Sequence, residues 1–417
     1  MISCIEALEY RCLNYVRRQI SPFQILVGAN ASGKSTFLDT VRFLGQLVSE
    51  GLDAAIQSRT ENLQDLVWQR QGNRFELAIE MLIPEAQRRL LQSSDFNICR
   101  YEICIGIDST TGENGLFAEK LLLTTMAEEK PIQRQLFPHG PERPPQTILR
   151  RTPAKGVKTV INKVSGGNDN FYDETGKGWD HAFKLGPRKS ALANLPEDET
   201  KFPVATWAKR ILTEGIDTIV LNSASMRKPS PPGQPRGFKP DGSNIPWVVE
   251  NLRKKNSEDE FFRWISHVRT ALPDLNIIKT IERPEDRHRY LQVIYKNGLE
   301  VPCWGVSDGT MRLLALTLLA YVGEPGKIYL VEEPENGIHP QAVETVFQSL
   351  SSTYDCQILC ASHSPVILSL AEPQDILCFA KTPDGATDIA RGDEHPKLSD
   401  WKRGADLGTL FATGVLG

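Results

Sequence analysis

The sequence lacks any apolar run that approaches the roughly 20 residues needed by a membrane-spanning helix. Its first residues include Glu6 and Glu9, and they lack the basic start and apolar core of a secretion signal. A charge imbalance is also missing, because 48 Lys and Arg stand against 52 Asp and Glu, a net charge of −4. We therefore expect a soluble, globular, cytoplasmic protein that neither crosses a membrane nor is exported.

Closely paired cysteines are absent as well. The eight cysteines are scattered, none forms a C-x-x-C pair, and most lie inside apolar runs, which is typical of small core residues in a reducing cytosol. Cys356 and Cys360 flank one predicted strand, but further ligands are missing nearby, so we expect no zinc site. The chain shows no internal repeat, no low-complexity tract and no heptad run long enough for a coiled-coil arm.

What the sequence does contain is a glycine-rich turn, GANASGKST, at residues 28–36. The apolar run at 23–27 predicts a buried strand before it, and the apolar spacing over 36–47 predicts a helix after it. This order of strand, turn and helix is the setting that a phosphate-binding loop requires. The bare pattern would arise by chance in about one or two of a hundred chains of this length, so the flanking elements strengthen the interpretation.

The residue types of this loop match the needs of a bound phosphate. Gly28 and Gly33 let backbone N–H groups turn toward phosphate oxygens, and the start of the helix adds partial positive charge. Lys34 can reach the terminal phosphates, and the Ser35 hydroxyl can ligate magnesium. We predict that the nucleotide is bound by Gly28, Asn30, Ser32, Gly33, Lys34, Ser35 and Thr36.

An acidic segment after a second apolar strand predicts the other half of the chemistry. Residues 328–331 predict a buried strand, and EEPENGIHP follows at 332–340. In magnesium-dependent nucleotide sites a carboxylate stands at the end of such a strand. We predict that Glu332 holds the magnesium shell and that Glu333 polarises the water that attacks the γ-phosphate.

Two further segments complete the candidate site. The predicted strand at 357–360 ends before His363, which at the carboxyl edge of a sheet can contact a terminal phosphate or orient water. The segment GVSDGT at 305–310 precedes a strongly helical stretch, and Ser307 and Gly309 at this helix start predict a second anion site. Because one nucleotide rarely needs two such sites in one chain, we expect this one to cap the γ-phosphate held by another subunit.

The middle of the chain has a different character. Strands at 74–82 and 100–107, with a hairpin into a third strand, predict an antiparallel edge on the nucleotide-binding sheet. Prolines then interrupt the chain, and basic residues outnumber acidic ones over 126–190. For this stretch we favour a solvated face over a patch for nucleic acid or an acidic partner. Two amphipathic helices that need a partner surface are predicted at 247–255 and 258–272.

In chain order, GANASGKST, VSDGTMRLLAL, IYLVEEPENGIHP and CASHSP resemble the Walker A, signature, Walker B with D-loop, and H-loop motifs of ABC-type ATPases. More narrowly, they resemble the SMC/RecF-like AAA ATPases of bacteria, a group that includes the OLD-family ATPases and the ATPase subunits of antiphage systems such as PARIS and Septu. The resemblance implies that Lys34, Glu333 and His363 act on ATP with Mg²⁺, which Ser35 and Glu332 would hold. It also implies that Ser307 and Gly309 act in trans.

Some features depart from the family pattern. Glu332 stands where the first Walker B acid is usually Asp, which implies a longer or water-mediated magnesium contact. The glutamine that links magnesium to the inserted arm in such ATPases has two candidates here, Gln69 and Gln71. OLD-type nucleases also carry a C-terminal Toprim domain with acidic metal ligands. Since no second acidic cluster is apparent in the sequence, we predict no intrinsic nuclease.

We therefore predict an α/β fold, an ABC/SMC-like P-loop ATPase head with an inserted α+β domain. The head would combine residues 1–125 and 288–417, and the insertion would span 126–287. The predicted function is an ATP-hydrolysing switch that closes a homodimer or larger oligomer and controls a separately encoded effector in antiphage defence. The alternative is a RecF/SMC-like DNA-repair ATPase that binds DNA directly through the basic insertion. A third hypothesis is a scaffold that binds ATP and barely hydrolyses it.

Overall fold

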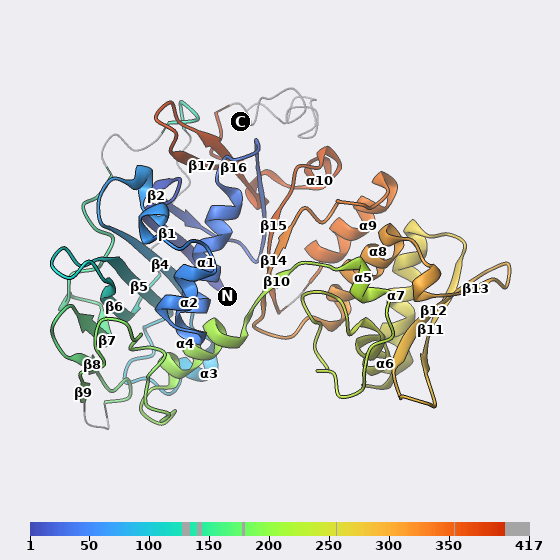
Figure 1. The fold of residues 1–417 in the computed structure, drawn as a ribbon, viewed down its shortest axis with the longest axis horizontal. Helices are drawn as coiled ribbons and strands as arrows, with labels where there is room; N and C mark the ends of the chain where they lie inside the picture. Colours follow the sequence, from blue (N-terminus) through green and yellow to red (C-terminus); the bar gives the residue numbers. More distant parts are fainter. Residues whose placement is uncertain (127–133, 140–143, 177–179, 256, 354, 397–417) are drawn as a thin grey trace.

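The computed structural model describes residues 1–126, 134–139, 144–176, 180–255, 257–353 and 355–396. Three β-sheets follow one another across the molecule, with helices beside and between them (Figure 1). This mixed α/β architecture agrees with the predicted fold class. Within the described residues, no helix is both long and apolar enough to cross a membrane.

The first sheet is antiparallel and has eight strands. In spatial order they are β2 (Leu13–Gln19), β1 (Ile2–Tyr10), β4 (Arg74–Leu82), β5 (Ile98–Ile107), β6 (Asn114–Thr124), β7 (Lys158–Val164), β8 (Asp169–Phe171) and β9 (His181–Phe183). One face packs on helices, which are α1 (Lys34–Ser49), α2 (Leu52–Gln57), α3 (Glu85–Arg88) and α4 (Pro203–Glu214). Tyr10, Phe43 and Phe75 form an aromatic cluster in the core between sheet and helices.

The second sheet has six strands and carries the glycine-rich turn. In spatial order they are β10 (Ile216–Ile219), β14 (Ile328–Glu332), β15 (Gln357–Ala361), β3 (Phe23–Gly28), β16 (Ile376–Lys381) and β17 (Thr387–Arg391). All pairs are parallel except β16 with β17. The neighbours β14, β15 and β3 are almost wholly buried, as their continuous apolar sequences predict. Their carboxyl ends therefore meet at one edge of the sheet, where the predicted site residues follow.

The third sheet is small and antiparallel, and helices pack against it at the far end of the molecule (Figure 1). Its strands are β11 (Leu275–Glu282), β12 (Arg289–Tyr295) and β13 (Glu300–Pro302). The remaining helices are α5 (Ser223–Met226), α6 (Ile245–Lys255), α7 (Ser257–Ala271), α8 (Asp308–Val322), α9 (Pro340–Ser351) and α10 (Pro365–Leu370), with single 3₁₀ turns η1 (Leu63–Leu66), η2 (Trp68–Arg70), η3 (Cys303–Gly305) and η4 (Pro373–Asp375). The two predicted amphipathic helices, α6 and α7, find their partner surface on α8. Trp264 of α7 donates a hydrogen bond of 3.0 Å to Thr317 of α8.

The strand pairing joins strands of the predicted insertion at 126–287 to strands outside it. β7, β8 and β9 continue the first sheet, and β10 pairs in parallel with β14 of the second. The strands that follow residue 74 were expected at an edge of the nucleotide-binding sheet, and this was wrong, because they form a separate sheet with β1 and β2. Periodicity identifies a strand, but its partner strand is a tertiary contact that local sequence does not specify.

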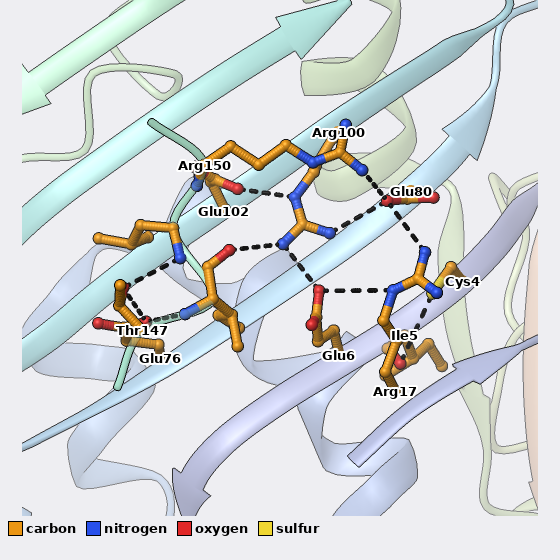
Figure 2. A network of polar contacts seen from close by, with 12 residues as sticks. Cys4, Ile5, Glu6, Arg17, Glu76, Glu80, Arg100, Glu102, Thr147 and Arg150 are labelled. Atoms are coloured by element: carbon orange, nitrogen blue, oxygen red, sulfur yellow. Dashed lines mark hydrogen bonds and ion pairs between the residues drawn. The ribbon is translucent and has the colours of Figure 1, made fainter. Parts of the chain in front are cut away.

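The face of the first sheet away from α1 carries a network of buried charges (Figure 2). Arg100 of β5 forms ion pairs with Glu6, Glu80 and Glu102 at 2.8, 3.1 and 2.7 Å. Arg150, on a segment that crosses this face, binds Glu80 at 2.9 Å. Because side chains alternate along a strand, the apolar residues of β5 face the helices while its charged residues face this segment.

Several basic residues of the 126–190 stretch have partners inside the molecule. Lys163 is 3% exposed and binds Asp169 at 2.6 Å. Arg134 binds Asp388 of β17 at 2.9 Å. The prediction of a solvated face was therefore wrong for Lys163, which is buried, whereas Arg134 and Arg150 are partly exposed and paired with carboxylates of the same chain. Such paired cations are not free to bind a nucleic acid.

Candidate nucleotide-binding site

The turn between β3 and α1 has a backbone that only glycine adopts readily at two positions. Gly28 has φ +150°, and a Cβ atom there would lie 2.1 Å from the carbonyl oxygen of Phe379. Gly33 has φ +107°, and its Cβ would lie 2.2 Å from Oγ1 of Thr387. The loop is thus folded tightly against β16 and β17, and both glycines are required by this close approach.

Lys34 is the first residue of α1 and folds back over the turn. Its Nζ donates hydrogen bonds to the carbonyl oxygens of Gly28 at 2.8 Å and Ala29 at 3.0 Å. Burial lowers the pKa of Lys34 to about 8, although the carboxylates of Glu333 and Glu332 oppose that shift. The ammonium group is therefore mostly charged at pH 7, but its hydrogen-bond partners are neutral carbonyls.

Ser35 and Glu332 meet across the space between α1 and the end of β14. The Ser35 hydroxyl donates a hydrogen bond of 2.5 Å to Oε2 of Glu332, and Arg42 donates to Oε1. Burial alone would raise the pKa of Glu332, but the hydrogen bonds from Ser35 and Arg42 outweigh it and lower the pKa. The carboxyl group is therefore ionised at neutral pH.

These oxygens fit a magnesium ion. Mg²⁺ prefers oxygen ligands and is commonly held by one or two protein groups together with substrate phosphates. The direct contact between Ser35 and Glu332 shows that the longer acid at this position still reaches the hydroxyl. We expect these two residues to hold the ion.

Glu333 and His363 stand at neighbouring strand ends, after β14 and β15. Glu333 has φ +49°, an uncommon value for a residue other than glycine, and its carboxylate accepts a hydrogen bond from Asn336. Nε2 of His363 lies 3.9 Å from Oε1 of Glu333. Burial, followed by the charge of Lys34, lowers the pKa of His363, so the imidazole is neutral at pH 7.

Glu335 holds the histidine segment in place. Its Oε1 accepts hydrogen bonds of 2.8 Å from the hydroxyl of Ser362 and from the backbone N–H of His363. A half-buried carboxylate that accepts two donors fixes the backbone of the segment that carries the imidazole. Glu335 is therefore a positioning residue for His363.

A cavity of about 360 Å³ gathers most of the predicted site residues. Its lining consists of Cys12, Asn30, Ala31, Ser32, Gly33, Lys34, Ser35, Thr36, Glu332, Glu333, Ala361 and His363. The hydroxyl of Ser32 is buried and has no hydrogen-bond partner among the described residues. A phosphate oxygen is the kind of acceptor that this hydroxyl lacks, so the loop fits a nucleotide.

Ser307 and Gly309 do not line this cavity. Ser307 caps α8, with its hydroxyl accepting from the backbone N–H of Thr310 at 3.2 Å. A Cβ on Gly309 would lie 2.5 Å from the carbonyl oxygen of Gly337, in the loop after Glu333. Gln69 and Gln71 are also outside the cavity, and the Gln69 side chain donates to the carbonyl oxygen of Asp384 at 3.2 Å.

The sequence reasoning missed three residues of this site. Cys12 comes from the turn between β1 and β2, far from every motif, and no sequence signal points to it. Glu335 lies within the Walker B segment but was given no role. Arg42 follows Ser35 by seven residues, and this helical spacing places both side chains on one face of α1 but does not specify the contact with Glu332.

Comparison with known proteins identifies both a family and a fold. Residues 160–369, half of the chain, match the family model described as "AAA domain, putative AbiEii toxin, Type IV TA system". An Smc head bound to the C-winged helix domain of ScpA has a TM-score of 0.52 and 15% identity, covering 93% of this chain and 97% of that one. The comparison with curated proteins returned no match.

A second solved structure has the same fold. It is the Smc head domain with an extended coiled coil bound to the C-terminal domain of ScpA, derived from Pyrococcus furiosus. Its TM-score is 0.51 and its identity 13%, with 93% of this chain and 95% of that chain covered. The family match at 160–369 includes GVSDGT at 305–310, EEPENGIHP at 332–340 and His363, whereas the glycine-rich turn at 28–36 lies before it. The chain therefore belongs to the AbiEii-type AAA domain family, and its fold is that of an ABC/SMC-like ATPase head.

Proposed function

We propose that this protein is an ATP-dependent switch that binds ATP with Mg²⁺, hydrolyses it, and closes around it as a homodimer or larger assembly. The observation that carries the proposal is the convergence of Lys34, Glu333 and His363 on one cavity. Ser307 and Gly309, which the motif assigns to the same reaction, lie outside that cavity. A complete site then needs the signature segment of a second copy of the chain.

Nucleotide binding falls to the turn and the start of α1. In this proposal Lys34 exchanges its two neutral carbonyl acceptors for anionic phosphate oxygens, which adds the attraction of opposite charges to its hydrogen bonds. The hydroxyl of Ser32 gains an acceptor in the same step. Mg²⁺ held by Ser35 and Glu332 supplies electrostatic neutralisation of the phosphates.

Hydrolysis falls to Glu333 and His363. Glu333, oriented by Asn336, accepts a hydrogen bond from the attacking water and polarises it toward the γ-phosphate. The neutral imidazole of His363 keeps one donor and one acceptor nitrogen, so it can orient that water or donate to a phosphate oxygen. Glu335 keeps the histidine in this position by accepting a hydrogen bond from its backbone N–H.

Replacing Glu333 tests the hydrolytic role. We expect Glu333→Gln to release phosphate about 100-fold more slowly than the wild type, because an amide cannot polarise the water as a carboxylate does. Glu344→Gln, an exposed position of α9 that hydrogen-bonds only to Gln348 among the described side chains, is the matched control and should keep the wild-type rate. If Glu333→Gln and the wild type release phosphate equally fast, the hydrolase proposal fails.

Sizing of the same variant tests the sandwich. Glu333→Gln should keep ATP bound because it hydrolyses the nucleotide slowly. Its molar mass by light scattering should therefore be higher with ATP than without nucleotide. A mixture of Lys34→Met and Ser307→Arg chains should then regain part of the activity that each lacks alone, since a mixed dimer contains one intact composite site. No mass increase with ATP, together with no constitutive oligomer, would reject the sandwich.

We further propose that the switch controls a separately encoded effector in a defence system. The support is the family description, which names a toxin within a toxin–antitoxin system and therefore a component that acts with another gene product. Co-expression with the products of the neighbouring genes tests this, with the expectation that one of them co-purifies in an ATP-dependent manner. If none binds with or without ATP, the effector proposal fails and the ATPase proposal stands.

A further inference from the structure

We propose that Arg42 is a built-in counter-ion that competes with the divalent cation for Glu332, so that the metal binds tightly only together with ATP. The inference rests on the proposed function and adds a residue to which neither the motifs nor the family match assign a role. It concerns a step before hydrolysis, and it can be tested without turnover.

Both oxygens of the Glu332 carboxylate are engaged. Oε2 accepts from Ser35 at 2.5 Å, and Oε1 accepts from a terminal guanidinium nitrogen of Arg42. The Arg42 and Glu332 side chains are 26% and 33% exposed, so water screens this ion pair less than a surface pair. The acid that would hold the metal is therefore already neutralised by a cation of the chain itself.

Nothing else among the described residues neutralises Arg42. Its Nε atom is buried without a hydrogen-bond partner, and its one described ion pair is with Glu332. Asp39, one turn earlier on α1, is committed elsewhere. It forms a bidentate pair with Arg59 and accepts from Tyr10 at 2.6 Å.

A divalent cation held by Ser35 and Glu332 would share one carboxylate with the Arg42 guanidinium, since Ser35 and Arg42 contact its two oxygens. Like charges on one carboxylate repel, so the metal must displace Arg42 or bind more weakly beside it. The phosphates of ATP add negative charge at the same place and offset this repulsion. Arg42 thus makes metal binding depend on nucleotide, while it keeps Glu332 oriented beside Ser35 before the nucleotide arrives.

Binding of Mn²⁺ to the full chain without nucleotide, followed by the electron paramagnetic resonance signal of free Mn²⁺, tests this inference. We expect Arg42→Gln to bind Mn²⁺ at least fivefold more tightly than the wild type, because the competing cation is gone. Arg42→Lys retains the charge and should behave like the wild type. Arg89→Gln removes an arginine from the exposed pair with Glu85 and should change nothing. Glu332→Gln in the Arg42→Gln background should abolish the gain.

Unchanged or weaker Mn²⁺ binding in Arg42→Gln would overturn the proposal and leave Arg42 with an orienting role only. If that variant fails to fold, Arg42→Met tests the same point, since it removes the guanidinium charge, leaves Glu332 and Ser35 unchanged, and should also bind Mn²⁺ more tightly. No gain in Arg42→Met would likewise overturn it. A wild type that releases no phosphate would instead reject the proposed function, and the Mn²⁺ measurement distinguishes the two failures.

Discussion

The charged side chains around Arg100 and those in the cavity differ in how their charges are compensated. Around Arg100 on the first sheet, cations and carboxylates neutralise one another inside the chain (Figure 2). In the cavity, Lys34 donates to backbone carbonyls, and His363 remains neutral beside it. The first cluster is complete as it stands, whereas the second is arranged for charge that a ligand brings.

The pKa values of the central cations, Arg100 and Lys34, shift in opposite directions. Burial alone would lower the pKa of Arg100, but the carboxylates of Glu6, Glu102 and Glu80 outweigh it and raise the pKa. For Lys34 burial prevails, and the pKa falls to about 8. A buried cation with a raised pKa indicates a structural partner, and one with a lowered pKa inside a cavity is typical of a functional site.

The largest predicted effect is the loss of stability when Arg100 is removed from its cluster. We expect Arg100→Met to lower the free energy of unfolding by about 3–5 kcal/mol, because carboxylates that are buried with Arg100 lose their cation. Chemical denaturation followed by circular dichroism measures this loss. The affinity of the folded fraction for ATP should not change, since Arg100 is on the face of the sheet away from α1.

Arg89→Met is the control for that experiment. Arg89 pairs with Glu85 on the surface, where both side chains are about three-quarters exposed, and exposed pairs contribute little. Equal stability of Arg100→Met and Arg89→Met would show that the network does not hold the segment around Arg150 on the sheet. A loss of ATP affinity in Arg100→Met would show that the two clusters are coupled.

The second prediction concerns pH and sharpens the contrast. ATP affinity should fall as pH rises from 7 to 9, approaching about tenfold per unit above the Lys34 pKa of about 8, because the neutral amine no longer attracts phosphate. The effect on stability has the opposite sign. Since the ordinary lysine pKa of 10.5 in the unfolded chain exceeds the folded pKa of about 8, the unfolded chain binds more protons between pH 7 and 9, and the contribution of Lys34 to stability rises with pH.

Titration of ATP binding at several pH values, with a fluorescent analogue, provides the measurement. Lys34→Met should bind weakly and show no such pH dependence, which identifies the titrating group. Arg100 stays charged throughout, because its pKa is raised, so the network should contribute nothing to the profile. A wild-type affinity that is constant between pH 7 and 9 would contradict the assignment of Lys34.

The same distinction explains what could be predicted from sequence. Lys34 and Ser35 are covalent neighbours within one motif, and Glu332 ends a strand whose preceding residues are all apolar, so local pattern was enough to single out these three cavity residues. Arg42 was missed because its contact joins α1 to β14, and a helix spacing alone does not name the partner. The charges around Arg100 were missed because alternating polar residues on a strand indicate a solvated face, unless another segment covers it.

The smallest predicted effect uses Cys12, a cavity residue without a motif. All eight cysteines are described and free, and Cys12 is partly exposed at the cavity whereas the other seven are buried, as expected for core residues. ATP should therefore slow alkylation of native protein by a maleimide several-fold, and Cys12→Ser should remove the ATP-sensitive label.

Mass spectrometry of labelled peptides provides the rate for each cysteine. Lys34→Met, which should not retain ATP, is the control and should be alkylated at Cys12 at one rate with or without nucleotide. In Arg100→Met we expect faster alkylation of Cys4 and Cys99, because loosening the first sheet exposes them. ATP should not slow this labelling. If saturating ATP leaves Cys12 labelling unchanged in the wild type, the nucleotide does not fill the cavity between the β1–β2 turn and Lys34.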